Sequence, residues 1–477
     1  MRVDLFGIGI KSKSPAITAE RRINCFVEMR REMDRTRYVL VGRRGLNLFI
    51  SSLGNVPTRG MWAVNTITTP LLFVVQGNTL YSVNNGGGVT TIGMINTSTG
   101  NVSMVDDGTF LVLVDGTNGW VYNMTTLAFT KITDGNFTTT PTTVTWQDRY
   151  FIVTAGQGRQ FQLSQISPSV DPTVWPSVQI NFAGSGAGSL RAGLADHAVL
   201  NLFGDVYTEF WQDTGSPDFP YAQIPSAAAQ FGLAAPWSLT QFDNSMAGLF
   251  QDKSGALNIS RMSGFTLKKL SDVDLESIIQ DYPVFADAQA IAFMVTGHPM
   301  YLITFPSANQ SWMYDEQSKT WGQVTDTNGN VFWGNKYAYF QNQLVISDSR
   351  NGNLYFMQGS ASTDNGSVIP MEVWSKHIWN DDKYVGIPWI QVDIESGVGL
   401  VTGQGSTPVI DLQVSDDGGN SFYSVGYSSM GALGQYTQRV TWSSLGSARD
   451  RVLKLRITDP VKRIITGASA EIVGGSF

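Results

Sequence analysis

Short apolar runs separated by turn dipeptides constrain the fold of this chain more than any other feature of its sequence. Between residues 56 and 358, the runs at 71–75, 110–114, 150–153 and 301–305 are rich in β-branched and aromatic residues. Dipeptides that supply the positive φ of a hairpin turn recur between such runs: Asn85-Gly86, Asp115-Gly116, Asn118-Gly119, Asn328-Gly329 and Asn351-Gly352. The pattern predicts an all-β protein built from hairpins.

The hairpins recur at a nearly regular interval. Marker residues in the strands that follow the turns are spaced by 39 to 55 residues: Tyr81, Tyr122, Phe161, Tyr207, Asn258, Met313 and Tyr355. A four-stranded propeller blade takes roughly 40 to 50 residues. We therefore predict a β-propeller of six or seven blades over residues 56–366, with a large irregular β-sandwich as the alternative.

One unit of the repeat is clearer than the others. Trp312, Tyr314 and Asp315 end one predicted strand, a short polar turn follows, and Trp321 opens the return strand. Kelch-type hairpins bury aromatic residues between blades with this arrangement. We therefore expect these four residues to have a structural role in the core of a blade.

Two segments depart from the hairpin pattern. The apolar spacing of residues 273–282 predicts a short amphipathic helix, with Ser271 and Asp274 as its capping box and Pro283 as its end. Beyond residue 366, longer alternating strands separated by turns rich in Pro, Gly and Ser predict a second, sandwich-like β domain over residues 367–477.

The N-terminus is basic, whereas the rest of the chain is acidic. Residues 1–45 carry a net charge of +6 and the remainder −13. We expect residues 1–55 to form a basic arm with entry strands that docks on a neighbouring molecule, and deletion of residues 1–45 to leave a folded β protein. Direct contact with nucleic acid and a plain solvated segment are the alternatives. The candidate interaction residues are the arginines of this segment, Arg21, Arg22, Arg30, Arg31, Arg35, Arg37, Arg43 and Arg44.

The sequence offers few residues for metal or covalent chemistry. Cys25 is the one cysteine, and His197, His298 and His377 have no metal-ligand spacing. No G-x-S-x-G elbow or P-loop motif is present. No apolar run has the length of a signal peptide or membrane span. We expect no cofactor, no metal, no catalytic residue and no membrane span.

One motif is shared with sugar-cleaving enzymes. Ser415, Asp417, Gly419, Ser421 and Phe422 match the Asp-box of sialidases and related propellers, in which the carboxylate caps a tight turn. We therefore expect Asp417 and Gly419 to be structural. A sialidase-like glycoside hydrolase is a weak alternative, because hydrolysis needs two carboxylates that converge on one bond.

Several blocks of the sequence resemble the tail hub or nozzle proteins of short-tailed bacteriophages, which are also called packaged-DNA stabilisation proteins. The resemblance rests on the order and spacing of these blocks rather than on a catalytic fingerprint. The blocks are Glu209-Phe210-Trp211, Gly215, Phe219-Pro220-Tyr221, Ile224, Gly232 to Pro236, Arg21 to Glu28, Gly42 to Leu46, Leu270 to Tyr282, and Gly297-His298-Pro299 through Tyr314-Asp315 to Trp321.

The resemblance implies a structural protein of the virion tail that assembles in the host cytoplasm. It implies a homohexameric ring of propeller subunits below the portal and its adaptor ring, which retains packaged DNA and conducts it during ejection. The implied partners are other copies of the chain, the portal and head-to-tail adaptor ring, a tailspike or tail fibre, a tail needle or plug, and the DNA in the lumen. A receptor- or carbohydrate-binding propeller is the main rival.

Overall fold

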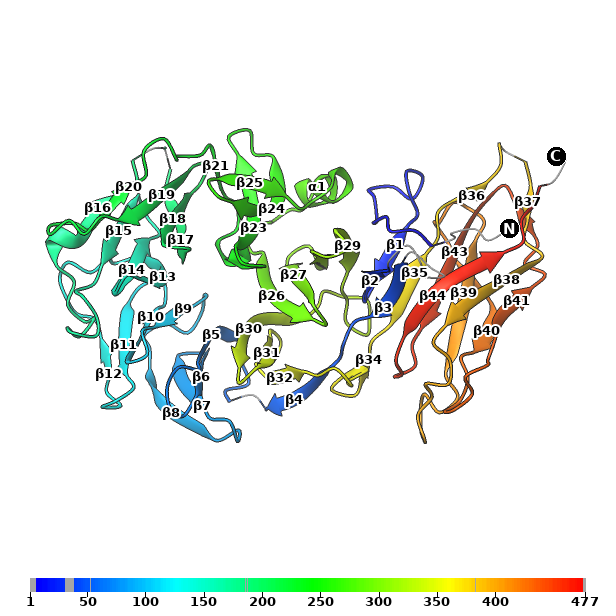
Figure 1. Ribbon diagram of the computed structural model, residues 1–477, viewed down its shortest axis with the longest axis horizontal. Coiled ribbons are helices and arrows are strands. Elements are labelled where there is room, and N and C mark those ends of the chain that lie inside the picture. The colour runs from blue at the N-terminus through cyan, green and yellow to red at the C-terminus, as the bar shows by residue number, and fades with distance from the viewer. Residues whose placement is uncertain are drawn as a thin grey trace.

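The computed structural model shows an elongated all-β molecule with a propeller at one end and a sandwich at the other (Figure 1). It describes residues 6–30, 38–51, 53–184, 186, 188–381 and 383–474. The sandwich lies beside the propeller, next to the blades that contain β26 (Gln289–Val295) and β30 (Gly334–Phe340). Both parts of the predicted architecture are therefore present.

The propeller has seven blades, each an antiparallel sheet, and in five of them consecutive strands pair throughout. The first three blades are β5 (Thr58–Val64), β6 (Leu71–Gln76), β7 (Thr79–Val83) and β8 (Val89–Met94); β9 (Ser103–Asp106), β10 (Phe110–Val114), β11 (Gly119–Asn123) and β12 (Phe129–Lys131); and β13 (Pro141–Gln147), β14 (Tyr150–Ala155), β15 (Gln160–Leu163) and β16 (Ile180–Phe182).

The next three blades continue this order. They are β17 (Leu190–Asp196), β18 (Val199–Gly204), β19 (Thr208–Asp213) and β20 (Tyr221–Gln223); β21 (Phe231–Leu233), β22 (Thr240–Gln241), β23 (Met246–Asp252), β24 (Leu257–Ser263) and β25 (Thr266–Lys269); and β26, β27 (His298–Phe305), β28 (Gln310–Asp315) and β29 (Thr320–Gln323). In the fifth blade, β21 and β22 both pair with β23 and flank the 3-10 turn η2 (Pro236–Ser238).

The seventh blade is closed by a strand from the N-terminal part of the chain. It contains β30, β31 (Gln343–Asp348) and β32 (Leu354–Met357), and β4 (Leu46–Ile50) pairs antiparallel with β32 as the outer strand. The short strands β33 (Thr363–Asp364) and β34 (Ser367–Val368) extend this sheet. The first and last parts of the propeller sequence are thus hydrogen-bonded, which holds the ring of blades closed.

The sandwich packs two sheets on one apolar core. One sheet is β2 (Cys25–Met29), β3 (Tyr38–Gly42), β44 (Ile464–Ala470), β38 (Trp389–Ile394) and β41 (Val440–Ser443). The other contains β35 (Met371–Trp374), β43 (Asp450–Ile457), β39 (Val409–Ser415) and β40 (Tyr423–Ser429), and β36 (Ile378–Trp379) also pairs with β43. The short strands β37 (Val385–Gly386), β42 (Ser447–Ala448) and β45 (Val473–Gly474) form a small sheet beside them.

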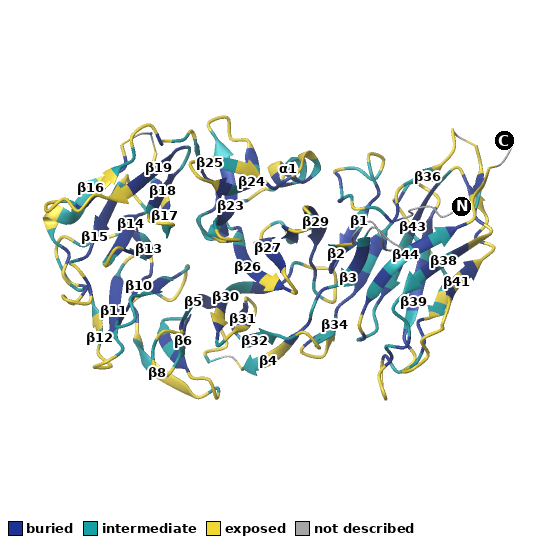
Figure 2. Cartoon of the chain, in the orientation of Figure 1, coloured by how far each residue is buried: buried dark blue, intermediate teal, exposed yellow. Residues whose placement is uncertain are grey.

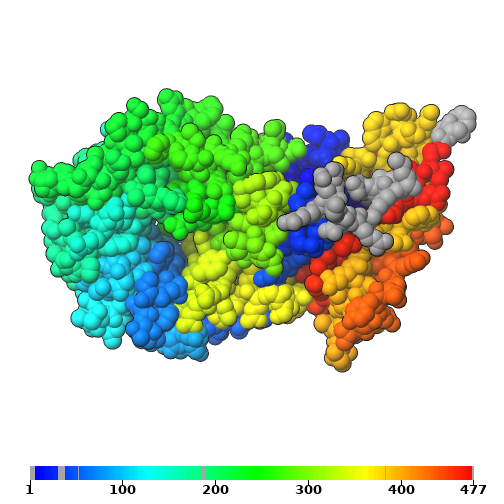
Figure 3. Space-filling view, in the orientation of Figure 1, coloured from blue at the N-terminus to red at the C-terminus, as the bar shows by residue number. Residues whose placement is uncertain are grey.

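One strand joins the two domains into a continuous sheet. β1 (Arg21–Ile23) pairs antiparallel with β35 of the sandwich and parallel with β29 of the sixth blade. The N-terminal residues form a band between the propeller and the orange and red sandwich (Figure 3). The structure therefore revises the boundary predicted at residue 55. The described residues before it are strands of both domains rather than an arm.

Apolar packing follows the same plan. Seven clusters of buried residues each lie between two adjacent blades, and an eighth fills the sandwich. Exposed residues gather on the hairpin turns at the rim (Figure 2). The apolar runs of the sequence are thus the strands that pack in the inter-blade cores, and the turn dipeptides are the loops between these strands.

The predicted helix is present, but its cap is one residue later than expected. α1 is Val273–Gln280, and it buries Leu275 and Ile279 between the fifth and sixth blades. Its N-cap is Asp272, whose side chain accepts a hydrogen bond from the Leu275 N–H at 2.9 Å. The Ser271 hydroxyl instead donates to Glu276 at 2.7 Å, which leaves Asp272 to cap the helix.

Candidate functional site

A central channel runs between the inner strands of the seven blades. Its cavity of about 640 Å³ is lined by residues of β5, β9, β13, β17, β26 and β30, together with η2 and β22 of the split fifth blade. Every blade therefore contributes to one cavity.

Two charged side chains line this channel, Asp106 and Lys336. Asp106 accepts hydrogen bonds from the indole N–H of Trp62 at 2.7 Å and from the Gly108 N–H at 2.9 Å. Burial raises the pKa of this carboxyl group in spite of those bonds. Asp106 is therefore held against the wall of the channel by the two groups that donate to it.

Lys336 has a different environment. Its ammonium group donates to Gln289 Oε1 at 3.0 Å and lies 4.9 Å from the ring centre of Trp237. No described acidic residue forms an ion pair with it. Burial inside the channel lowers the pKa of Lys336 to about 7.

A second cluster of polar residues lies at the junction between the propeller and the sandwich. Arg43, between β3 and β4, donates to both carboxylate oxygens of Asp364, at 3.0 and 2.5 Å. Its Nε donates to Asn24 Oδ1 at 2.9 Å. The side chains of Arg43 and Asp364 are only 8% and 6% exposed, so this pair is enclosed by both domains.

Asn24 connects the same cluster to the sixth blade. It is fully buried, has a φ of +56°, and follows β1 directly. Its side chain donates to Pro370 O at 2.9 Å and accepts from the Thr325 N–H at 3.0 Å. Asparagine adopts a positive φ more readily than most residues, which suits it to this bend in the chain.

Two further arginines complete the junction. Arg22, which is 2% exposed, donates to Trp321 O at 2.6 Å. Arg463 donates to the carbonyls of Ile369 and Arg43, and burial lowers its pKa to about 10. Backbone carbonyls of both domains therefore accept hydrogen bonds from cations buried between them.

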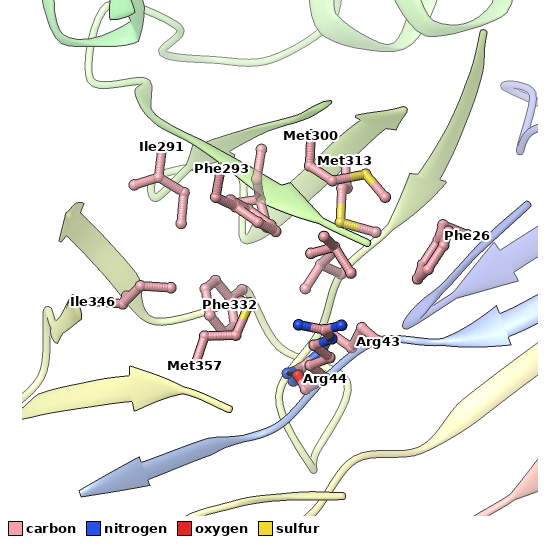
Figure 4. Close-up of a pocket in the computed structure, with 13 residues that line it drawn as sticks. Phe26, Arg43, Arg44, Ile291, Phe293, Met300, Met313, Phe332, Ile346 and Met357 are labelled. Atoms are coloured by element: carbon pink, nitrogen blue, oxygen red, sulfur yellow. Dashed lines mark hydrogen bonds between the residues drawn. The ribbon is translucent and has the colours of Figure 1, made fainter. Parts of the chain in front are cut away.

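A small apolar cavity of about 20 Å³ adjoins Arg43 and Arg44 (Figure 4). Side chains of the sixth and seventh blades surround it, and Phe26 of the sandwich closes one side. Its lining is almost entirely apolar, including Met300, Met313 and Met357. A cavity of this size and polarity is a packing gap in the inter-blade core rather than a site for a polar ligand.

The eight predicted interaction arginines do not form one surface. Arg21, Arg22 and Arg43 have partners within their own chain, and Arg21 lies 5.3 Å from the ring centre of Trp374. Arg30 and Arg44 remain accessible, and Arg30 pairs with Glu28 at 3.2 Å. Arg31, Arg35 and Arg37 lie outside the described residues. Arg21, Arg22 and Arg43 thus lie at the domain junction, and the docking role expected of the eight arginines stays a prediction.

The structure places Trp312, Tyr314 and Trp321 in the core between the fifth and sixth blades. Their exposed fractions are at most 3%. The indole of Trp321 donates to Leu270 O at 2.8 Å. Asp315 lies at the turn, where it bonds to the imidazole of His298 at 2.9 Å and accepts from the Ser318 hydroxyl at 2.7 Å.

The Asp-box residues lie in the sandwich, on the turn between β39 and β40. Asp417 Oδ1 accepts from the Ser415 hydroxyl at 2.6 Å and from the Ser421 N–H at 2.9 Å. These hydroxyl and backbone donors hold the pKa of Asp417 well below its usual range. Gly419 has a φ of +93°, which a side chain would oppose. The Asp417 carboxylate thus accepts its hydrogen bonds from residues of the turn itself.

Reasoning from the sequence missed Asp364, Arg463, Asn24 and Lys336 as members of buried polar sites. Asp364 lies 321 residues from its partner Arg43, so no local motif marks the pair. Lys336 stands in an ordinary strand pattern. Two blocks of the family resemblance contain residues of this junction: Arg21 to Glu28 contains Asn24, and Gly42 to Leu46 contains Arg43.

The part of the chain that the structure describes contains no cluster of three or more His, Cys, Asp or Glu side chains arranged to hold a metal ion. None of its helices has the length and apolar character needed to cross a membrane. Cys25 is buried in the sandwich core, where burial raises the pKa of its thiol to about 12.

Two family models match the chain, one for each domain. Residues 7–362 match the model described as bacteriophage P22 Gp10, beta-propeller. Residues 370–473 match the model described as bacteriophage P22 Gp10, beta-sandwich. Together they span nearly the whole chain and agree with the two domains of the structure.

Other comparisons add only distant likenesses. No curated protein matches the chain. A chain of the mitotic checkpoint complex is 14% identical, with 69% of this chain and 95% of that chain covered and a TM-score of 0.43. The extracellular domain of BT4673 from B. thetaiotaomicron is 10% identical, with 77% of this chain and 46% of that chain covered and a TM-score of 0.45. The family match is therefore the comparison that bears on function.

Proposed function

The chain belongs to the bacteriophage P22 Gp10 family, whose members are structural tail proteins, and from this membership we propose that it is the tail hub, or nozzle, of a short-tailed phage. The observation that carries the proposal is the match of both domains in the order of that family. The proposed role is structural rather than catalytic, in a virion assembled in the host cytoplasm.

We propose that six copies form a ring below the portal and its adaptor. A ring with cyclic symmetry uses head-to-tail contacts, so each subunit needs two different complementary surfaces. The elongated molecule offers a propeller surface and a sandwich surface of unlike shape (Figure 1). Its junction supports such a role, because the continuous sheet through β1 and the buried Arg43–Asp364 pair oppose hinge motion between the domains.

The proposed work of the ring is to retain packaged DNA and to conduct it during ejection. The chain carries a net charge of −7, and an acidic lumen repels phosphates, so DNA slides through it without adhering. The proposed partners are the portal and adaptor ring above, and a tailspike or fibre and a needle or plug around and below. Arg30 and Arg44, which remain accessible, stay candidates for these contacts.

The native mass of the purified chain tests the ring. Mass photometry should give a species of about six times the 52.1 kDa of one chain, alone or after addition of the adaptor ring. A strictly monomeric chain under both conditions would contradict the hexamer. It would favour the receptor- or carbohydrate-binding propeller, which needs no ring.

A further inference from the structure

The propeller channel contains a cation whose hydrogen-bonding capacity is largely unused. An ammonium group has three N–H donors. The structure gives Lys336 Nζ one hydrogen-bond acceptor among the described residues, Gln289 Oε1, and one aromatic ring, that of Trp237. The rest of the group lies at the channel cavity of about 640 Å³ that both residues line.

Two enclosed arginines of this chain have several acceptors in the protein. Arg59 donates to the carbonyls of Gly77, Thr97 and Gly100 at 2.7 to 2.8 Å. Arg451 donates to Asp416 at 2.7 Å and to Leu445 O at 2.7 Å. Lys336 has neither a carboxylate nor a set of carbonyls, so its charge is not compensated by described residues.

Trp237 supplies a second unused donor beside this lysine. The indole N–H groups of Trp62, Trp312 and Trp321 each donate to a protein acceptor. That of Trp237 has no acceptor among the described residues, although its ring lines the same cavity. The remaining N–H groups of the Lys336 ammonium and the indole N–H of Trp237 therefore lack acceptors among the described residues, and they occur together in a cavity that is closed around its circumference by seven blades.

We propose that the propeller channel binds a small anion, a phosphate or carboxylate group held by Lys336 and Trp237. Such a group forms a charge-assisted hydrogen bond with the ammonium, which is stronger than a neutral one. The attraction is greater inside the channel than in bulk water, because protein surrounds the lysine. The site belongs to the propeller of a single chain, so it does not depend on the hexameric ring.

The other titratable groups of the channel do not take the place of this anion. Asp106 already accepts from Trp62 and Gly108, and it forms no ion pair with Lys336. The Tyr337 hydroxyl bonds to the Thr240 hydroxyl, and the Tyr339 hydroxyl accepts from the Met294 N–H at 2.8 Å. Burial raises the pKa of both tyrosines, which keeps them neutral where the lysine is charged.

Competitive acetylation of the wild-type chain tests the proposal without a variant. Lys336 and the exposed Lys253 are labelled with acetic anhydride at about pH 6, and the rates are read by peptide mass spectrometry. A bound anion favours the charged ammonium, and each unit of upward pKa shift lowers the neutral, reactive fraction about tenfold at this pH. Inorganic phosphate should therefore slow labelling of Lys336 about tenfold relative to Lys253.

Further experiments show which kind of anion binds and whether Trp237 acts as the second donor. Acetate replaces inorganic phosphate in one series, which shows whether a carboxylate or a phosphate is preferred. Trp237→Phe keeps the ring but removes the indole N–H, and it should weaken the protection of Lys336. In calorimetry, Lys336→Met should lose the heat of phosphate binding, whereas Lys253→Met should keep it. Equal labelling of Lys336 with and without phosphate and acetate would overturn the proposal.

Discussion

Hydroxyl and amide side chains connect the inner strands of the propeller, where neighbouring blades have no backbone ladder between them. Ser103 bonds to the backbone of Val144, Thr143 accepts from the Gly193 N–H at 2.9 Å, and Thr145 accepts from the Ala195 N–H at 3.1 Å. Asn335 donates to Thr58 O at 2.9 Å across the closure between the last blade and the first. The abundance of Thr, Ser and Asn thus has a structural use at the channel wall.

Aromatic side chains between blades carry much of the stability at this scale. Trp321→Ala removes a side chain that is 2% exposed and leaves its space unfilled, and such a change costs about 3 to 5 kcal/mol of unfolding free energy. Denaturant titration should show the loss. The matched control is Trp379→Ala, since Trp379 is 61% exposed and its replacement should leave the midpoint nearly unchanged. Equal effects of the two variants would show that Trp321 is not in a core.

Lys336 should make stability depend on pH. Its pKa is about 7 in the folded chain, against about 10.4 in an unfolded one, so between these values the unfolded state binds more protons. The free energy of unfolding therefore rises with pH through this window. Lys336→Met should flatten the rise and stabilise the chain most at and below pH 7. Thermal unfolding at intervals from pH 6 to 10 measures both slopes, and identical slopes would refute the assignment.

The residues that could be predicted from the sequence are those with a local signature. Trp312 and Trp321 belong to one hairpin, and Asp417 belongs to one turn, so spacing alone marks them. Lys336 and Arg43 acquire their environments from strands far away in the chain. Their burial depends on which strands become neighbours, and that information is absent from any short window of sequence.

At the scale of the element, four N-terminal strands hold the two domains together. β1 bridges the sixth blade and the sandwich, β2 and β3 belong to a sandwich sheet, and β4 completes the seventh blade. A segment of some thirty residues thus supplies strands to three sheets. This segment therefore connects the propeller to the sandwich.

Deletion of residues 1–45 should abolish the folded protein, which reverses the expectation from charge alone. The deletion removes β1, β2 and β3, including the buried core residues Cys25, Val27 and Leu40. Both β35 and β44 would then expose strand edges that are paired in the intact chain. Expression should give aggregated protein. A soluble, monodisperse fragment with an intact melting transition would show that the N-terminal strands are not needed for folding.

The buried ion pair at the junction should be costly to break. Arg43→Met leaves the Asp364 carboxylate enclosed without its partner, and a loss of this kind costs about 3 to 5 kcal/mol. Lys462→Met removes an exposed pair with Glu395, which is worth roughly 0 to 1 kcal/mol. Denaturant titration compares the two variants.

A double variant separates the charge from the packing. Arg43→Met with Asp364→Leu replaces both charges by apolar groups, and it should recover part of the stability that Arg43→Met loses. A cost for Arg43→Met no greater than for Lys462→Met would show that the pair is not enclosed in solution.

The sequence predicted the strands and blades better than it predicted which distant strands pair. All seven marker residues lie in or directly before the third strand of a blade, because the turn chemistry that spaced them is local. The closure by β4 and the bridge by β1 were not predicted, since both are pairings between strands some 300 residues apart. The charge of residues 1–45 suggested a basic arm that docks on a neighbouring molecule, whereas strand pairing within the chain buries part of that charge.

As a whole molecule, the chain is a closed propeller fixed to a sandwich. Seven inter-blade cores and one sandwich core stabilise it without a disulfide, and its single cysteine is buried. The continuous sheet and the buried cations between the domains favour motion as one body. This rigidity suits a subunit that holds its position against the pressure of packaged DNA, which is the role proposed from the family.

The DNA content of particles tests that role most directly. Particles are assembled by the phage with the gene for this chain disrupted, and the fraction that contains DNA is measured before and after addition of the purified protein. The account predicts mostly empty particles without the chain and restored DNA retention with it, while Arg43→Met, if it fails to fold, restores nothing. Full retention of DNA in particles that lack the chain would contradict the account.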